Sequence, residues 1–322
     1  MFNFAFGPFL KLVSFFKEVL RIEDKRIINM SQSEMISYLA QSNDLTPFSI
    51  GSNIPASLDT DLVWRTHDIG QTNDENDGYE ASDSVVNFST TSPLIIQTFD
   101  FGYAPATFGH FDIKDGDGGQ VIEIIDGWAS VLMTRDGGDG LQWFIGSVKN
   151  DLGWLMFRDD INENWKSTIV DLSKSYIHNE RPWFYNFAYT RYRKMKVTLP
   201  IFIRGIQQSI QTFDAVVCEH YDNKDVTQAT ALERFVFVKG MGLTYWQRYQ
   251  NSIDVSHDSL SLIAQNNGVF KRLPDVPELN EEIPSSWVMT DGRCWTNFVH
   301  YANSISVRKF NWDDLLYLVA NY

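Results

Sequence analysis

Cysteine is scarce in this chain of 322 residues, which has only two, Cys218 and Cys294. They could form at most one disulfide, and a chain of this length can bury a sufficient core without one. The sequence therefore leaves open whether the two thiols are bridged and which redox compartment holds the protein.

Long apolar runs are missing as well. No stretch of about 18 apolar residues occurs, so we expect no membrane-spanning helix. The apolar start, residues 1–10, lacks the basic region that precedes the apolar part of a signal peptide. We therefore expect a soluble chain that is synthesised in the cytoplasm and not cleaved there. Its final location stays unknown, with virion and cell surface among the options.

Basic charge is in short supply. The 41 acidic and 27 basic residues give a net charge of −14. This argues against nucleic acid as a partner, because a general nucleic-acid binder needs a basic field to displace counterions. The one basic cluster could pair with acidic residues of this chain or of another subunit; its members are Arg191, Arg193, Lys194 and Lys196.

Several motifs of known chemistry are absent. The chain has no GxxxxGK[ST] phosphate loop, no GxGxxG, no GxSxG, no HExxH and no CxxC pair. We expect no cofactor, but the absence narrows the function little, because many hydrolases and nearly all binding modules also lack these motifs.

What the chain does have is apolar and aromatic side chains in number. Hydrophobic residues make up 43% of the chain and charged residues 21%, close to the balance of an ordinary globular protein. Between residues 85 and 250, short β-branched or aromatic runs alternate with Gly and Asp. This spacing predicts a mostly β fold, an antiparallel β-sandwich of jelly-roll type with short helical extensions at both ends.

Individual strands can be placed from these runs. Pro200 has no N–H to donate, so its strand should begin there or lie at an edge. The expected strands are Leu94 to Phe101, Val121 to Ile125, Ala129 to Thr134, Leu141 to Val148, Trp154 to Arg158, Phe184 to Tyr192, Met195 to Ile203, Phe213 to His220, Glu233 to Lys239 and Leu243 to Tyr249.

Helices are expected mainly outside this region. Ser31 followed by Glu34 is a capping-box pattern that predicts a helix over residues 32–41. Apolar spacing predicts further helices at Phe9 to Glu23, within Asn162 to Leu172, and at Trp312 to Asn321. The expected organisation is a helical arm at 1–58, an acidic loop at 59–84, a β core at 85–250 and a loop-rich segment with a closing helix at 251–322.

Three glutamates lie in apolar, strand-like contexts and are weak candidates for catalysis: Glu123, Glu219 and Glu233. Burial raises the pKa of a carboxyl, and a raised pKa is what a general acid in sugar hydrolysis needs. The simpler interpretation is that alternation along a strand puts each glutamate on the solvent face.

A calcium site is conceivable at one hairpin, where the weak candidate ligands are Asp115, Asp117, Glu123 and Asp126. The spacing fails the EF-hand pattern, because Gln120 stands where glycine is required and Asp126 where a bidentate glutamate is usual. We therefore favour a Gly/Asp hairpin without metal.

Cys218 and His220 would share one face of a strand, which allows a nucleophile and its base to be neighbours. Nothing in the sequence supplies a third residue to orient the histidine. A buried structural cysteine is the preferred interpretation.

The most distinctive segment is the aromatic stretch from Arg181 to Arg193. On a strand, Trp183, Tyr185 and Tyr189 would share one face and offer flat apolar area with polar tips to a glycan or a protein. The alternative is that these side chains belong to the core.

Taken together, these features favour a non-enzymatic structural or recognition subunit of a larger assembly, viral or phage among the options, or a carbohydrate-recognising surface protein. The expected partners are protein subunits of the same assembly, in a homo-oligomer, with a glycan as a further option. The alternative is a sandwich-type glycoside hydrolase or polysaccharide lyase that uses the strand carboxylates and an aromatic cleft.

Overall fold

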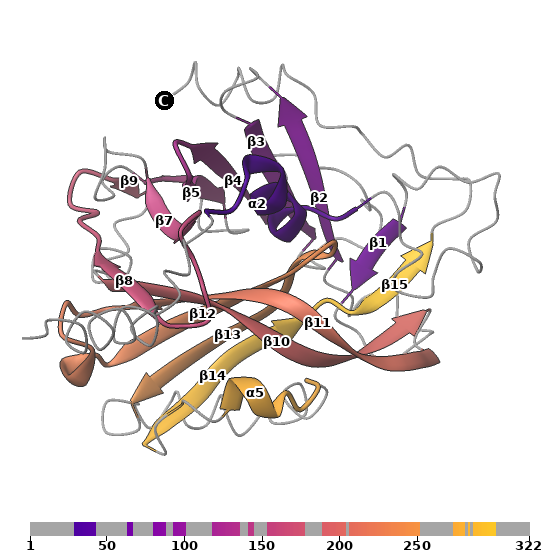
Figure 1. The fold of residues 1–322 in the computed structure, drawn as a ribbon. Helices are drawn as coiled ribbons and strands as arrows, with labels where there is room; N and C mark the ends of the chain where they lie inside the picture. Colours follow the sequence, from indigo (N-terminus) through magenta and orange to yellow (C-terminus); the bar gives the residue numbers. More distant parts are fainter. Residues whose placement is uncertain are drawn as a thin grey trace, which may run out of the picture.

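The computed structural model of the chain describes residues 29–42, 63–66, 80–87, 93–100, 118–135, 141–144, 153–177, 189–203, 206–251, 273–280, 283 and 286–300 (Figure 1). The helices expected at Phe9 to Glu23 and Trp312 to Asn321 lie outside these ranges.

Strands dominate the described part, which confirms the prediction of a mostly β protein. The strands are β1 (Val63–Thr66), β2 (Glu80–Asn87), β3 (Pro93–Asp100), β4 (Gly118–Ile125), β5 (Trp128–Arg135), β6 (Leu141–Trp143), β7 (Trp154–Arg158), β8 (Lys166–Ile169), β9 (Tyr176–Ile177), β10 (Tyr189–Ile203), β11 (Ile206–Tyr221), β12 (Ala231–Val238), β13 (Gly242–Asn251), β14 (Trp287–Cys294) and β15 (Asn297–His300). The helical elements are α2 (Gln32–Leu39), η4 (Val226–Gln228) and α5 (Pro277–Asn280).

The strand pairing runs as one path, in the order β14-β13-β12-β11-β10-β15-β1-β2-β3-β4-β5-β6-β9. Every pair is antiparallel except that of β10 and β15, which run parallel over two residue pairs. Along β2 to β5 and along β10 to β14, each strand pairs with the next in sequence. These two runs are therefore meanders, in which short connections join neighbouring antiparallel strands.

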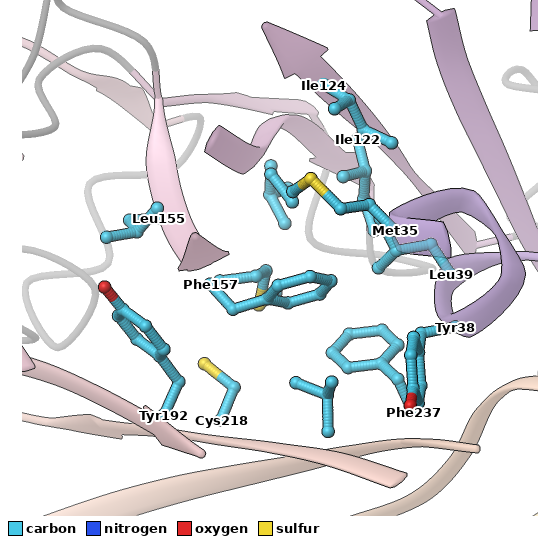
Figure 2. Packing of buried hydrophobic residues seen from close by; sticks show 14 of the residues in the cluster. Met35, Tyr38, Leu39, Ile122, Ile124, Leu155, Phe157, Tyr192, Cys218 and Phe237 are labelled. Atoms are coloured by element: carbon cyan, nitrogen blue, oxygen red, sulfur yellow. The ribbon is translucent and has the colours of Figure 1, made fainter. Parts of the chain in front are cut away.

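The larger core cluster lies between the two meanders. Met35 of α2, Ile122 of β4 and Phe157 of β7 pack in one cluster with Cys218 of β11 and Phe237 of β12 (Figure 2). All five side chains are fully buried. Burying each large apolar side chain stabilises the fold by roughly 1.5–3 kcal/mol, so this cluster holds the two groups of strands and α2 together.

The opposite face of β10–β13 is covered as well. Val217 and Val236 belong to a second cluster with Val276 and Leu279, which lie in and beside α5. Figure 1 shows α2 and α5 on opposite sides of these strands. Successive residues of a strand point to opposite faces, so β11 places Val217 in this second cluster and Cys218 in the first.

The helix expected over residues 32–41 is present as α2, and it ends at Leu39. The Ser31 hydroxyl accepts a hydrogen bond from the Glu34 N–H at 3.1 Å, as an N-cap should. The Glu34 carboxylate bonds to Lys194 Nζ of β10 at 3.1 Å. The cap therefore also fixes α2 against the sheet.

Two expected strands, Phe184 to Tyr192 and Met195 to Ile203, correspond in the described part to the single strand β10, which begins at Tyr189. Pro200 sits inside β10 and pairs with Ile210 of β11. The Lys194 N–H donates to Asn162 O, on the side of β10 away from β11, and Pro200 is an even number of residues further on. Its missing N–H therefore costs the β10–β11 ladder no bond. The expectation that this strand begins at Pro200 or lies at an edge is wrong, because β10 begins at Tyr189 and pairs with β11 on one side and with β8 and β15 on the other.

The helix expected within Asn162 to Leu172 is wrong. Lys166–Ile169 form strand β8, which pairs with the start of β10. Helical spacing put Ile169 on a buried stripe, but its side chain is 51% exposed. Pairing with β10 overrides the apolar period here.

Strands also occur where the sequence indicated loops. β1 and the first residues of β2 fall within the acidic segment 59–84, and β14 and β15 fall within the segment 251–322. β15 pairs with both β1 and β10, so it connects the two meanders.

Candidate functional site

Glu219 of β11 is the centre of a buried ionic network. Its Oε1 accepts hydrogen bonds from Arg234 Nε at 2.9 Å and Nη2 at 2.7 Å. Its Oε2 accepts from Arg191 Nε at 2.5 Å and from the Tyr221 hydroxyl at 2.6 Å. Arg234 Nη1 donates further to Leu279 O at 2.6 Å. Two arginines and a tyrosine thus saturate one carboxylate.

The electrostatics of this network decide the charge of Glu219. Burial alone would raise the pKa of this carboxyl, but Arg234 and Arg191, helped by the Tyr221 hydrogen bond, hold it below the usual range. Glu219 is therefore a carboxylate and not a protonated general acid. Its role in the described structure is to position the arginines.

The three candidate glutamates do not form a catalytic pair in the structure. Glu219 is the register partner of Arg234, whereas Glu233 is the partner of His220 one residue away, so Glu219 and Glu233 point to opposite faces of the sheet. Glu123 lies on β4 in the other meander, where partial burial raises the pKa of its carboxyl. This geometry argues against Glu219 and Glu233 as a catalytic pair, because residues on opposite faces cannot flank one bond.

Cys218 and His220 are neighbours, as the sequence predicted for one strand face, with Sγ and Nε2 3.3 Å apart. His220 Nε2 also lies 2.9 Å from Leu155 O, and a carbonyl oxygen only accepts, so Nε2 carries the proton. The ring stacks on Trp154 with centroids 4.2 Å apart. The nitrogen beside the thiol therefore has no lone pair with which to act as a base.

Burial reinforces this conclusion. It raises the pKa of the Cys218 thiol well above its ordinary value and lowers the pKa of His220 to about 3, although the Leu155 hydrogen bond opposes the second shift. Both groups are neutral at pH 7, and both side chains are fully buried. A reactive cysteine needs an accessible thiolate, so this pair is structural.

Cys218 and Cys294 do not form a disulfide, and their positions explain why. Cys218 belongs to the core cluster beneath α2, and Cys294 to the cluster beside α5 on the opposite face of the sheet. Side chains on opposite faces cannot meet the distance limits of a disulfide.

Of the four calcium candidates, the described residues include Glu123 and Asp126. Asp115 and Asp117 lie outside the described residues. Asp126 occupies a two-residue turn with Gly127 between β4 and β5, with φ of 49° and 77°. Positive φ at both positions is the type I′ hairpin turn, a structural role for this aspartate that needs no metal. Within the described ranges, no group of three or more His, Cys, Asp or Glu side chains is placed to hold a metal ion.

Of the aromatic candidates, Trp183 and Tyr185 lie outside the described residues. Tyr189 begins β10, is half-buried, and meets the Tyr221 ring edge-on with centroids 6.0 Å apart. Its ring packs against a small core cluster formed with Leu232 and Tyr249. Tyr189 thus has packing contacts on one side and partial exposure on the other.

The basic cluster of β10 pairs with acidic residues of this chain. Arg191 bonds to Glu219 and Lys194 to Glu34, and Lys196 Nζ lies 2.7 Å from Asp214 Oδ1. Arg193 places its guanidinium over the Trp165 ring at 4.6 Å. The basic side chains of β10 therefore contact acidic and aromatic side chains of the same chain.

A surface that the sequence reasoning overlooked lies at the outer half of the β10–β11 pair. We name it the outer ribbon and define it as Val197–Ile203 and Ile206–Phe213. Ile206 is 66% exposed and Ile210 64% exposed, whereas Leu199 and Ile201 of β10 are fully buried. Ile210 is the register partner of Pro200 and so points away from the face of Leu199 and Ile201, and beyond the register shift Ile206 lies opposite Ile203. The ribbon is thus anchored in the core by Leu199 and Ile201, while Ile206 and Ile210 project into solvent.

A sequence signal for this surface exists. Arg204 is the only charged residue between Val197 and Phe213, in a chain where 21% of residues are charged. A β-rich stretch almost without charge is unusual for a solvent-exposed strand pair. The expected strands include Val197 to Ile203 but not residues 206–212, where Gln and Ser interrupt the apolar pattern.

The helices among the described residues are all too short to cross a membrane. Comparison with known proteins gives no relative: no family model, no curated protein and no solved structure matches the chain. The outer ribbon, the buried ionic network and the half-buried Glu123 are therefore the features from which a function can be argued.

Proposed function

We propose that the protein is a non-enzymatic structural or recognition subunit of a larger assembly, such as a virion or phage particle, and that it contacts other protein subunits through the outer ribbon. The observation that carries this proposal is the exposure of Ile206 and Ile210 on neighbouring parts of β11. Burial of a large apolar side chain contributes roughly 1.5–3 kcal/mol, so a partner that covers both gains substantial binding energy.

The base of the ribbon supports the same role. The inner half of β11, Ala215 to Tyr221, is buried throughout and bonded to β12. The Glu219 network ties this half to β10 through Arg191 and to β12 through Arg234. A contact surface held on a rigid base loses less conformational entropy on binding than a mobile loop does.

The layered arrangement expected from the sequence, an antiparallel sandwich of jelly-roll type, also belongs to this proposal. The packing of Ile122 and Phe157 over Cys218 and Phe237 supports two layers. Structural and recognition proteins often use such layered β folds, although a fold alone does not establish a function.

The test is the mass of the complexes that the protein forms in the cells that naturally produce it. A tagged wild-type chain and an Ile206→Thr/Ile210→Thr variant are purified from those cells and compared by native mass spectrometry. Threonine keeps the β-branched shape and removes most of the apolar contact. We expect complexes heavier than the 37.1 kDa chain for the wild type and mainly the free chain for the variant.

Ile169→Thr provides the matched control, because Ile169 is also exposed on a strand but lies on β8, outside the outer ribbon. This variant should assemble as the wild type does. A wild-type chain that is recovered only at its own mass, or a double variant that assembles normally, would contradict the proposal.

A second candidate function is carbohydrate recognition or cleavage, and the raised pKa of half-buried Glu123 is the observation that favours it. In this alternative, Trp183, Tyr185 and Tyr189 bind the sugar and Glu123 donates a proton. Glycan-array binding by the wild type that is lost in Tyr189→Ala, or glycan cleavage that is lost in Glu123→Gln, would favour this alternative over a purely structural role.

A further inference from the structure

The outer ribbon has an open strand edge. β12 pairs with β11 only from Ala215 to Tyr221, so the stretch from Ile206 to Asp214 has β10 as its only strand neighbour in the described part of the chain. A strand edge presents a row of N–H and C=O groups that can pair with another strand.

The backbone groups that face this edge can be identified. Asp214 O accepts a hydrogen bond from Lys239 N at 2.9 Å, on the β12 side of β11. Backbone groups alternate in direction along a strand, so those of Thr212 and Ile210 point to the same side as those of Asp214. Thr212 and Ile210 thus offer donors and acceptors at an edge where no described strand pairs with them.

The usual protection of such an edge is weak here. Natural proteins block exposed edges with charged side chains, proline or a bulge. Residues 206–213 contain no charged residue and no proline. The register shift opposite Gln208 lies near the end of the ribbon, so Ser209 to Asp214 pair regularly with β10.

The charge of this edge indicates which kind of partner it can bind. An anionic surface would require basic side chains at the edge, and a strongly basic partner would require several acidic ones, but the only charged residue from Ser209 to Asp214 is Asp214, which pairs with Lys196 of the same chain. Two copies of a chain with net charge −14 repel each other least where their surfaces are uncharged. An edge that runs antiparallel to its own copy across a two-fold axis also matches donors to acceptors automatically, because the two surfaces are identical.

We infer that two copies of this chain pair antiparallel through the β11 edge, Ser209 to Asp214, with Ile206 and Ile210 covered in the contact. This inference rests on the proposed function, because it names the partner of the outer ribbon. The backbone bonds of Thr212 and Ile210 provide the alignment of the two copies, and the isoleucines provide apolar burial.

Sedimentation velocity of the purified full-length chain across a concentration series tests the inference. We expect a dimer, at twice the mass of the 37.1 kDa chain, with no other component present. Thr212→Pro removes the outward N–H without removing a β10–β11 bond and should raise the dimer dissociation constant at least tenfold. Thr212→Ala loses the same contact with Thr198 Oγ1 but keeps the N–H, so it should dimerise nearly as the wild type does.

A second variant keeps the test decisive if Thr212→Pro does not fold. Ile210→Cys adds one exposed thiol to a chain whose own cysteines are fully buried. A short bismaleimide should link this variant into covalent dimers, whereas the control Ile169→Cys should stay monomeric under the same conditions.

A wild-type chain that stays monomeric at all concentrations, or equal dimerisation of Thr212→Pro and Thr212→Ala, overturns the inference. Binding of the monomer to neutral phosphatidylcholine vesicles would assign the ribbon to a lipid surface and overturn it as well. If the purified chain is monomeric but complexes from the producing cells still depend on Ile206 and Ile210, the homotypic partner is wrong and the proposed function stands.

Discussion

Arg234 donates two hydrogen bonds to one carboxylate oxygen of Glu219, from Nε at 2.9 Å and from Nη2 at 2.7 Å, and neither side chain is more than 1% exposed. A buried charge pair of this kind is weak evidence for stability in itself, because desolvation opposes the attraction. Removal of one member is different, since the other charge then stays buried without compensation.

Glu219→Gln should therefore destabilise the protein by about 3–5 kcal/mol, because it leaves Arg234 and Arg191 without their shared anion. Urea unfolding followed by circular dichroism measures this change. The comparison variant is Lys196→Ala, which removes an ion pair whose side chains are 70% and 55% exposed, and here we expect no more than about 1 kcal/mol. Equal effects of the two variants would show that the Glu219 network contributes no more than a surface pair.

His220 makes the stability depend on pH. Its pKa is about 3 in the folded protein and about 6.5 in an unfolded chain, so between these values the unfolded state binds a proton that the folded state does not. Stability should therefore fall as the pH is lowered from about 6.5 towards 3. His220→Gln, which can still donate to Leu155 O, should flatten this dependence.

Unfolding curves at pH 7, 6 and 5 provide the measurement. Glu219 should not affect the slope in this range. Its pKa is depressed, so its stabilisation is fully present here and is lost only as the pH falls below the ordinary glutamate range. A variant with the same slope as the wild type between pH 7 and 5 would show that another group is responsible.

The thiols should be free and hidden. Cys218 and Cys294 lie in clusters on opposite faces of the sheet, and both are fully buried. A colorimetric thiol reagent should detect no fast-reacting thiol in the folded protein and two in denaturant without reductant. Detection of no thiol in denaturant would indicate a disulfide and contradict the placement of the two residues.

Gly127→Ala should weaken the β4–β5 hairpin. Gly127 has φ of 77°, and a Cβ there would stand 2.4 Å from Asp159 Oδ2. The left-handed conformation costs a residue with a Cβ roughly 1–2 kcal/mol, so we expect at least that loss in free energy of unfolding. Asp126→Asn should change stability by only about 0.5 kcal/mol, because asparagine tolerates the φ of 49°. Similar losses of stability for both variants would show that the positive φ and close approach at Gly127 do not specifically require glycine.

Much of the strand content could be predicted from sequence, because the strands in residues 93–158 and 206–251 are β-branched or aromatic runs bounded by Gly and Asp. β1 and β15 escaped prediction because each has four residues and depends on partners far away in the chain. The Asp126-Gly127 turn carries a local signal, a DG pair between apolar strands, which agrees with the preferred interpretation of a Gly/Asp hairpin without metal.

The sites were harder to predict, since they depend on which face of a strand each side chain occupies. Glu219 and Glu233 look alike in sequence, but the register of β11 and β12 places them on opposite faces. Ile210 and Leu199 are both aliphatic residues of one strand pair, yet only packing determines that the first is exposed and the second buried. Periodicity identifies the two faces of a strand and cannot say which of them is covered.

The central claim, that the outer ribbon is the contact surface, is tested most directly by hydrogen exchange of the purified wild-type chain at low and high concentration. The amides of Ile210 and Thr212 face the open edge, so they should exchange rapidly when the chain is dilute and slow down when copies pair. We predict this slowing in a peptide that covers residues 206–214, with little change in β8, where Ile169 is exposed. Slower exchange that appears elsewhere while residues 206–214 stay unchanged would contradict the claim.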